Sequence, residues 1–392
     1  MAETASTVRV STGWSMPVAD PSTPLTGGAA PTLWLGANTP GGLALPAADP
    51  TPNQLYAPRG VWLDDERLIG ADTGNHRVLI WTDVDALGDH DDAAIVLGQP
   101  DPRTEGPQAG GRGPENGFHL PTGIAVHDDR LVVADAWNHR LLVWDRVPHR
   151  SDQAPDYVIG QPDAASVEEN RGGECAANSF YWPFGLAMID GQLWVADTGN
   201  RRVIVFDGIP TPGQDPSFVI GQRNFHEREE NRGQLGPSSF RWPHAIAATE
   251  DHVLVADAGN HRLLGWKGRP TSDQPAEILF GQPDFETAIE IPYAPQSAGT
   301  LRFPYAIDTD HGRLAVADTA NNRVLVWDEP PTASHTAADR VLGQHDFAST
   351  GENRWDQVGA DTLSWPYGLS LHGGRLAIAD SGNNRIMVWS VP

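Results

Sequence analysis

A short polar turn between two apolar runs recurs six times along the chain, and this repetition constrains the fold more than any other feature. Each turn begins with Ala-Asp and ends with Arg, as in residues 71–77. The aspartates are Asp72, Asp135, Asp197, Asp257, Asp318 and Asp380, at spacings of 63, 62, 60, 61 and 62 residues. Such regular spacing is typical of a tandem array in which each copy is one supersecondary unit. We therefore expect most of the 392 residues to form one repeat domain.

Each turn is predicted to join two β-strands of a hairpin. Residues 131–134 and 141–144, which flank the second turn, are apolar without alternation, so neighbouring copies should cover both faces of these strands. The Asp and Arg of each turn lie across the hairpin, where we expect the guanidinium to fork onto the carboxylate in a purely structural role. The predicted pairs are Asp72 with Arg77, Asp135 with Arg140, Asp197 with Arg202, Asp257 with Arg262, Asp318 with Arg323, and Asp380 with Arg385.

Two further elements recur around the hairpin. An apolar run ending in Gly-Gln follows it five times, for example at 158–161, and a strand that begins with proline precedes it, for example at Pro183. The last copy lacks the Gly-Gln run, whereas a related run, 33–37, precedes the first copy. An N-terminal strand that completes the last blade would close the ring and remove exposed sheet edges. The sequence therefore predicts an all-β fold, a closed six-bladed β-propeller of four-stranded antiparallel blades over residues 31–392, after an extended tail of residues 1–30.

The composition limits the classes of partner. Fifty-one acidic and 27 basic residues give a formal net charge of −24, which disfavours nucleic acid and anionic membranes as partners. The single cysteine, Cys175, cannot form an internal disulfide and is expected to be a free surface thiol rather than a nucleophile. No basic segment followed by an apolar run opens the sequence, and no 18 apolar residues are consecutive. We expect a cytoplasmic protein.

The turn motif resembles that of the NHL-repeat family, named for Asn-His-Leu, which reads here Asn75-His76-Arg77-Val78 and Asn138-His139-Arg140-Leu141. The resemblance covers about residues 31–392, and the Gly-Gln-Pro-Asp-Phe form at 281–285 is similar to the bacterial branch of the family. The resemblance implies a six-bladed propeller. It leaves the function open, because members of the family bind proteins, bind RNA or catalyse lyase chemistry.

Long loops such as 162–181 are expected at the same end of the propeller as the Asp-to-Arg turns, and that end should carry the function. Glu-Asn-Arg triplets at 169–171, 230–232 and 352–354 either fix these loops or frame a partner surface. The residue after each inner-strand proline differs between copies, as expected of a binding rim, although these side chains could merely fill the axis. Aromatic rings with one Arg and one His suit a peptide segment or a small anionic group. The predicted funnel rim is Arg59, Thr122, Phe184, His244, Tyr305 and Tyr367.

Other chemistries have weaker support, and we predict neither a metal nor a cofactor. His76, His139 and His261 recur in three turns, but Arg201, Asn322 and Asn384 take the same place in the other copies, so packing within the hairpin explains them better than zinc binding. A calcium site needs several inner-strand carboxylates. Asp308 alone lies well inside such a strand, with Ser370 and Trp62 at matching positions in adjacent copies.

The sequence thus favours a protein-interaction platform that binds a protein partner on the loop-bearing face. An accessory or assembly subunit of a larger enzyme complex is one role of this kind. One alternative is a metal-dependent or metal-free lyase or hydrolase in the central funnel, with His244, Arg59, Tyr305 and Tyr367 as first candidates. The second alternative is RNA binding, which requires a basic loop-bearing face.

Overall fold

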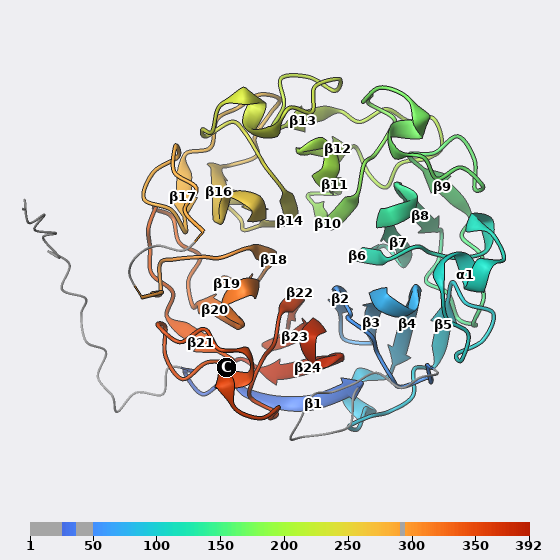
Figure 1. Ribbon diagram of the computed structural model, residues 1–392, viewed down its shortest axis with the longest axis horizontal. Coiled ribbons are helices and arrows are strands. Elements are labelled where there is room, and N and C mark those ends of the chain that lie inside the picture. The colour runs from blue at the N-terminus through green and yellow to red at the C-terminus, as the bar shows by residue number, and fades with distance from the viewer. Residues whose placement is uncertain (1–25, 37–49, 291–294) are drawn as a thin grey trace, which may run out of the picture.

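The computed structural model describes residues 26–36, 50–290 and 295–392, which form six four-stranded β-sheets. The sheets are arranged as blades around a central axis, with one end strand of each sheet innermost (Figure 1). Neighbouring strands within a blade are antiparallel, as in β10 to β13. The predicted closed six-bladed propeller with four-stranded antiparallel blades is confirmed.

Each of the first five blades uses four strands that are consecutive along the chain and that follow one another from the axis outwards. Blade 1 contains β2 (Gly60–Leu63), β3 (Arg67–Asp72), β4 (Arg77–Thr82) and β5 (Ile95–Leu97). Blade 2 contains β6 (Pro121–His127), β7 (Arg130–Asp135), β8 (Arg140–Trp144) and β9 (Tyr157–Ile159). Blade 3 contains β10 (Pro183–Ile189), β11 (Gln192–Asp197), β12 (Arg202–Phe206) and β13 (Phe218–Ile220). Blade 4 contains β14 (Pro243–Ala248), β15 (His252–Asp257), β16 (Arg262–Lys267) and β17 (Ile278–Phe280). Blade 5 contains β18 (Pro304–Asp310), β19 (Arg313–Asp318), β20 (Arg323–Trp327) and β21 (Arg340–Leu342).

Blade 6 joins the two ends of the described chain. It contains β22 (Pro366–His372), β23 (Arg375–Asp380), β24 (Arg385–Ser390) and, outermost, β1 (Ala30–Gly36). The register of β1 on β24 runs from Ala30 opposite Ser390 to Gly36 opposite Arg385. Figure 1 shows β1 beside β24 at the outer edge of the ring. The N-terminal strand therefore completes the last blade as predicted, and it begins one residue before the expected boundary at residue 31; residues 1–25 of the expected tail lie outside the described residues.

Short helices lie only in connections within the described residues. The six Asp-to-Arg turns contain η1 (Thr73–Asn75), η4 (Ala136–Asn138), η6 (Thr198–Asn200), η8 (Ala258–Asn260), η9 (Thr319–Asn321) and η11 (Ser381–Asn383). The longer connections contain η2 (Val84–Ala86), α1 (Pro107–Gly111), η3 (Pro114–Asn116), η5 (Glu169–Gly172), η7 (Glu230–Gly233) and η10 (Glu352–Trp355).

The core lies between neighbouring blades. One face of blade 1, with Ile69, shares a buried cluster with Val133 of blade 2. The other face, with Leu68, shares a cluster with Ile386 of blade 6, so both faces of the middle strands are covered. This burial explains why the apolar runs do not alternate with polar residues. Each blade therefore depends on its neighbours to bury its two faces.

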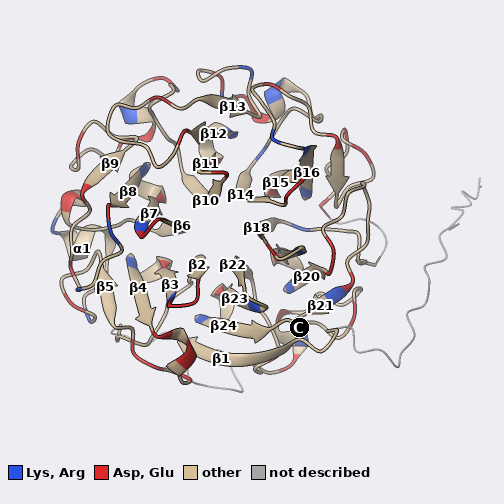
Figure 2. Ribbon diagram, turned by 180° about the vertical axis from the view of Figure 1, so that it is seen from behind, with Lys and Arg blue, Asp and Glu red and all other residues tan. Residues whose placement is uncertain are grey.

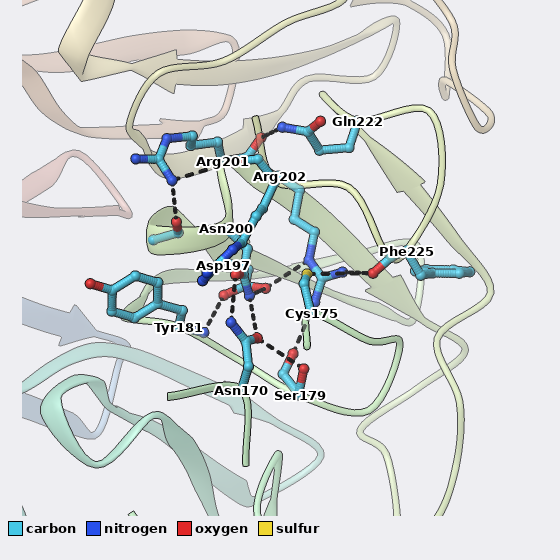
Figure 3. Close-up of polar contacts among 12 residues, drawn as sticks. Asn170, Cys175, Ser179, Tyr181, Asp197, Asn200, Arg201, Arg202, Gln222 and Phe225 are labelled. Carbon is cyan, nitrogen blue, oxygen red and sulfur yellow. Dashed lines mark hydrogen bonds and ion pairs between the residues drawn. The ribbon is translucent and has the colours of Figure 1, made fainter. Parts of the chain in front are cut away.

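The turn of blade 3 shows the role of the recurring aspartate (Figure 3). One carboxylate oxygen of Asp197 accepts a hydrogen bond from the backbone N–H of Tyr181 at 2.8 Å. The other accepts from the side chain of Asn200 at 2.8 Å and from Nε of Arg202 at 2.7 Å. The buried carboxylate thus joins the turn to the segment that leads into the innermost strand of the same blade.

The recurring arginine binds two loops as well as its aspartate. Nη2 of Arg202 donates to the carbonyl oxygens of Ala176 and Ser179, both at 2.9 Å, and Nη1 donates to that of Phe225. The predicted fork of the guanidinium onto the carboxylate is wrong, because only Nε of Arg202 reaches Asp197. The other N–H groups satisfy backbone carbonyls of the loops before and after the blade, which would otherwise be buried without a donor.

All six blades contain this arrangement, which we call the turn clamp. Its two side chains are buried in every blade, and Nε lies 2.7 to 2.9 Å from a carboxylate oxygen. The clamps are Asp72–Arg77, Asp135–Arg140, Asp197–Arg202, Asp257–Arg262, Asp318–Arg323 and Asp380–Arg385.

Candidate functional site

The two ends of the propeller differ in what they carry. One end holds the Asp-to-Arg turns and the connections from each outermost strand to the next innermost strand, and we call it the loop-bearing face. The opposite face holds the connections between the first and second strands and between the third and fourth strands of each blade. In blade 3, the turn clamp ties the turn to the two long connections beside it through Arg202.

Large apolar side chains are exposed on the loop-bearing face. In the described residues, the exposed fraction is 45% for Tyr56, 48% for Ile289, 82% for Trp355 and 38% for Trp365. All four lie in connections between an outermost strand and the next innermost strand, and no other large apolar side chain of the described chain is as exposed. Sequence reasoning did not single out these residues, because a large apolar side chain in a long loop can pack inwards as well as face solvent.

The six predicted rim residues surround one cavity on the axis of the propeller. It has a volume of about 80 Å³ and is also lined by the small residues that follow the rim positions, such as Gly60, Gly123 and Gly368. These glycines are required because a Cβ atom at Gly60 would lie 1.8 Å from the backbone oxygen of Thr122 in the next blade. We call this set the axial ring. Its members are Arg59, Thr122, Phe184, His244, Tyr305 and Tyr367.

Five members of the axial ring contact one another in sequence around the axis. The ring centroids of Phe184 and His244 are 4.5 Å apart, those of His244 and Tyr305 are 4.4 Å apart, and those of Tyr305 and Tyr367 are 4.5 Å apart. The guanidinium carbon of Arg59 lies 4.7 Å from the centroid of Tyr367, a cation–π contact. The side chains therefore fill part of the axis, as the alternative interpretation expected, and still leave the cavity between them.

His244 has a defined tautomer in this ring. Its Nδ1 lies 3.0 Å from the carbonyl oxygen of Trp242, and because a carbonyl only accepts, Nδ1 carries the hydrogen. Burial, with a smaller contribution from the charge of Arg59, lowers the pKa of His244 to about 4. At neutral pH the imidazole is therefore uncharged and its Nε2 is free to accept a hydrogen bond.

The histidines of the NHL motif make bonds between blades. Nδ1 of His139 in blade 2 accepts a hydrogen bond from the backbone N–H of Trp182 in blade 3 at 3.2 Å. Nδ1 of His76 accepts in the same way from Leu120, and Nδ1 of His261 from Phe303. The expected packing within the hairpin is therefore incomplete, because each ring reaches the residue that precedes the inner-strand proline of the next blade. We call these bonds the inter-blade latches.

Asparagine replaces histidine in two latches. Oδ1 of Asn322 accepts from the backbone N–H of Trp365 at 2.9 Å, and Oδ1 of Asn384 accepts from Ala57 at 2.9 Å. Arginine has no acceptor, and at Arg201 the latch is missing: the N–H of Trp242 bonds instead to Asp257 of its own blade at 3.3 Å. In five of the six blades the side chain at this position thus acts as a hydrogen-bond acceptor for the next blade.

The latch also correlates with backbone strain. Residues before a proline are disfavoured in helical regions, yet the latched residue has a positive φ in all five latches, for example 51° at Trp182 and 50° at Trp365. Trp242, which has no latch, does not have a positive φ. The hydrogen bond from the neighbouring blade therefore accompanies the strained conformation that precedes the axial ring.

A second cavity of about 310 Å³ lies on the same axis towards the opposite face. It is lined by Asp308, Ser370 and Trp62, the matching inner-strand positions singled out in the sequence. The carboxylate of Asp308 accepts hydrogen bonds from the backbone N–H groups of Thr309 at 2.8 Å and Leu371 at 2.7 Å. Burial nevertheless raises the pKa of Asp308 to about 7.

Cys175 is not the surface thiol that we expected. The side chain is 2% exposed, and its Sγ lies 3.5 Å from the carbonyl oxygen of Phe225, one of the acceptors of Arg202 (Figure 3). Burial raises the pKa of the thiol to about 11, so it is protonated and unreactive at neutral pH. The Gly-rich neighbourhood suggested exposure, whereas the turn clamp folds this loop inwards.

The Glu-Asn-Arg triplets fix the loops, one of the two roles expected for them. Asn170 and Asn200 exchange amide hydrogen bonds of 3.0 and 2.9 Å, which connect the triplet of η5 to the turn of blade 3. Asn353 and Asn383 exchange equivalent bonds in blade 6. Trp355 follows directly after the third triplet, so the most exposed tryptophan stands on an anchored loop.

Within the described ranges, no three His, Cys, Asp or Glu side chains are grouped closely enough to hold a metal ion. None of the helices in the same ranges has the length and apolar character needed to cross a membrane.

Comparison with known proteins agrees with this fold and motif. The family model of the NHL repeat matches residues 118–144 and 240–266, which contain the hairpins of blades 2 and 4. The chain is 25% identical to NHL repeat-containing protein 2 of Homo sapiens over 376 residues, covering 87% of this chain and 47% of the relative. It is 27% identical to the Gallus gallus protein of the same name, covering 86% and 47%. The chain thus spans about half the length of the curated relatives it matches.

A solved structure shows the same fold. It is a structural genomics protein of unknown function from Bacteroides thetaiotaomicron, with a TM-score of 0.52 and 14% identity over 93% of this chain and 75% of the other. A closed six-bladed β-propeller with repeated Asn-His-Arg turns is the class that fold and motif define. The chain carries NHL repeats, which the family model matches in blades 2 and 4, and it is similar to NHL repeat-containing proteins. Its assignment to the bacterial branch stays a prediction.

Proposed function

We propose that the protein is an interaction platform that binds a protein partner on its loop-bearing face. The observation that supports this is the placement of Tyr56, Ile289, Trp355 and Trp365, the exposed large apolar side chains of the described residues, on that one face. Tryptophan and tyrosine are enriched at the centres of protein interfaces because they bury a large apolar area with little loss of rotamer freedom. Leaving Trp355 82% exposed has no stabilising effect on the isolated fold.

The charges on this face favour a protein over RNA. Arginines of the long connections pair with glutamates of the same face, as Arg228 does with Glu169, and Arg302 with Glu290. Figure 2 shows acidic segments in the connections around the whole ring. A phosphate backbone would have to displace these pairs in a protein of net charge −24, whereas a protein surface with both signs of charge would not.

The finer proposal is that the partner belongs to a larger enzyme complex, in which this chain is an accessory or assembly subunit in the cytoplasm. The support is that the matched stretch makes up 47% of each curated relative, so more than half of each relative lies outside the match. Co-elution of the native protein with an enzyme activity at a mass well above 42.3 kDa would support this role. Elution of all the native protein at the mass of one chain would contradict it.

Affinity capture with paired variants tests the platform. Trp355→Ser and Trp365→Ser remove apolar area from the loop-bearing face, while Arg146→Ser, 81% exposed on the opposite face, is the matched control. The partner is then purified and its Kd measured against each variant. We expect a loss of tenfold or more for the tryptophan variants and less than twofold for the control. Equal affinity for all three variants would contradict the proposal.

An enzyme in the axial funnel is the second candidate, and one observation favours it. The neutral His244 directs an unprotonated Nε2 into a ring that also contains the cation of Arg59, which is the combination a metal-free lyase or hydrolase needs for a base and an anion partner. Incubation of native metabolite extract with wild-type protein and with His244→Gln tests it. A compound consumed by the wild type alone would support the enzyme, and no difference would contradict it.

A further inference from the structure

Arg59 is unusual among the arginines of this protein. Its side chain is half-buried and lines the axial cavity, yet it makes no hydrogen bond or ion pair within the described residues; its one specific contact is the face of Tyr367 at 4.7 Å. Every other buried or half-buried arginine in residues 26–36, 50–290 and 295–392 has a polar partner, even Arg201, whose Nη1 donates to Gly199 at 2.8 Å. The guanidinium of Arg59 thus has no hydrogen-bonding or anionic partner from the described residues and faces the open cavity.

The surroundings of Arg59 do not replace a counter-ion. The glutamates that pair with arginines on the loop-bearing face lie in the long connections rather than on the innermost strands, and no ion pair joins any of them to Arg59. A cation–π contact is worth only about 0.5 to 2 kcal/mol. The five N–H donors of Arg59 therefore remain available to a group that enters the cavity.

The rest of the axial ring defines what that group can be. A volume of about 80 Å³ admits a few heavy atoms. The adjoining rings of Phe184, His244, Tyr305 and Tyr367, of which only the two tyrosines are stacked, offer apolar surface to carbon atoms of the entering group. Burial and a side-chain hydrogen bond with Tyr367 raise the pKa of Tyr305, so its hydroxyl keeps its proton and adds no negative charge to the ring. With one cation in the ring, the charge balance matches a single negative charge, and the planar guanidinium matches the two oxygens of a carboxylate.

We propose that the axial ring is a binding site for one carboxylate group, which pairs with Arg59 while the aromatic rings pack around the carbon atoms behind it. The source of the carboxylate rests on the proposed platform function. We infer that the protein partner supplies this carboxylate from a side chain or from its C-terminus, which enters the axis while the partner covers Trp355 and Trp365. The carboxylate site itself can be tested without any partner.

Thermal unfolding of the full chain with sodium acetate, at an ionic strength held constant with sodium chloride, tests the site. Acetate should raise the Tm of the wild type with a half-effect in the millimolar range, as expected of a ligand with four heavy atoms. In Arg59→Gln, the acetate concentration that gives half the effect should be at least tenfold higher. Arg59→Lys keeps the charge but cannot bind both carboxylate oxygens in one plane, so its half-effect concentration should lie between those of the wild type and Arg59→Gln. Arg171→Gln removes an exposed arginine from the same face and should behave as the wild type.

Folding and competing anions are controlled in the same experiment. Arg59→Gln should unfold without acetate within a few degrees of the wild type, because the substitution removes only the contact with the face of Tyr367; if it does not fold, Arg59→Lys and Tyr367→Phe provide the comparison. Phosphate should stabilise less than acetate. An equal acetate effect in wild type and Arg59→Gln, or tighter Arg59-dependent binding of phosphate, would overturn the proposal.

Two small probes separate the sources of the carboxylate. N-acetylglycine offers a C-terminal carboxylate, and N-acetylglutamate amide offers a side-chain carboxylate. The tighter Arg59-dependent binder identifies the source, and failure of both to exceed chloride would contradict the site. If acetate binds but Trp355→Ser captures the partner as well as the wild type does, the platform proposal alone is contradicted. If partner capture depends on Trp355 but acetate does not bind, the carboxylate site alone is contradicted.

Discussion

Nδ1 of His139 in blade 2 accepts a hydrogen bond of 3.2 Å from the backbone N–H of Trp182 in blade 3. The bond connects the most characteristic residue of the repeat to the residue that precedes the axial ring of the next blade. It explains why His and Asn, but not every polar residue, maintain the positive φ of the latched residue.

Three variants of His139 separate the acceptor from the backbone conformation, since this residue has a φ of 53°. His139→Asn should retain most of the stability, as Asn322 and Asn384 do in their own latches. His139→Gly relieves the backbone but offers no acceptor, and it should lose about 1 to 3 kcal/mol through the unsatisfied N–H of Trp182. His139→Ala, which lacks the acceptor and keeps the strained backbone, should lose more than His139→Gly. Urea unfolding monitored by tryptophan fluorescence measures all three. Equal stability of the Asn and Gly variants would show that the latch contributes nothing.

The latches also predict sensitivity to acid. Burial lowers the pKa of His76, His139 and His261 from 6.5 to about 4. Between these pH values the unfolded chain binds more protons than the folded protein, so the free energy of unfolding falls as the pH drops from about 6.5 to 4. A triple His→Asn variant should lose less stability over this range than the wild type. Parallel pH curves for the two proteins would contradict this assignment.

The turn clamps are expected to be among the most sensitive positions in the fold. Asp197→Asn leaves the buried guanidinium of Arg202 without its anion, which typically costs about 3 to 5 kcal/mol. The matched control is Asp190→Asn, whose carboxylate is 62% exposed in its pair with Arg269 and should contribute less than about 1 kcal/mol. Urea midpoints of the two variants provide the comparison. A small loss in Asp197→Asn would mean that loop carbonyls alone hold Arg202.

Asp308 should give the opposite pH dependence from the histidines. Burial raises its pKa from 3.8 to about 7, so between these values the folded protein binds more protons than the unfolded chain. This group therefore makes the free energy of unfolding fall as the pH rises from about 4 to 7. The difference in stability between Asp308→Asn and the wild type should shift in favour of the variant over that range. A constant difference would indicate that Asp308 ionises normally.

The fold could be predicted from the sequence because each repeat contains the same strand and turn pattern. Regular spacing predicted six blades, and the missing Gly-Gln strand of the last copy predicted closure by the N-terminal strand. The latches were not predictable in this way, since His139 and Trp182 are brought together by the contact between blades and not by any local pattern. The predicted fork of Arg202 and the predicted exposure of Cys175 were wrong for a related reason. The loop carbonyls that bind the guanidinium, including that of Ala176 next to Cys175, lie 23 to 26 residues away in the chain.

The candidate site was partly readable. Divergence after the inner-strand prolines placed Arg59 and His244 on the axis, and the structure gathers both around one cavity. The exposure of Trp355 and Trp365 could not be read, because a tryptophan in a long loop is as compatible with packing inwards as with facing solvent.

Amide hydrogen exchange of the protein alone and in complex with its captured protein partner tests the platform most directly. We predict slower exchange in the complex for the loop-bearing connections at 50–57 and 345–365, which include Tyr56, Trp355 and Trp365. The strand connections of the opposite face, at 64–66, 128–129 and 311–312, should exchange at unchanged rates. Protection confined to these opposite connections would contradict the proposed function.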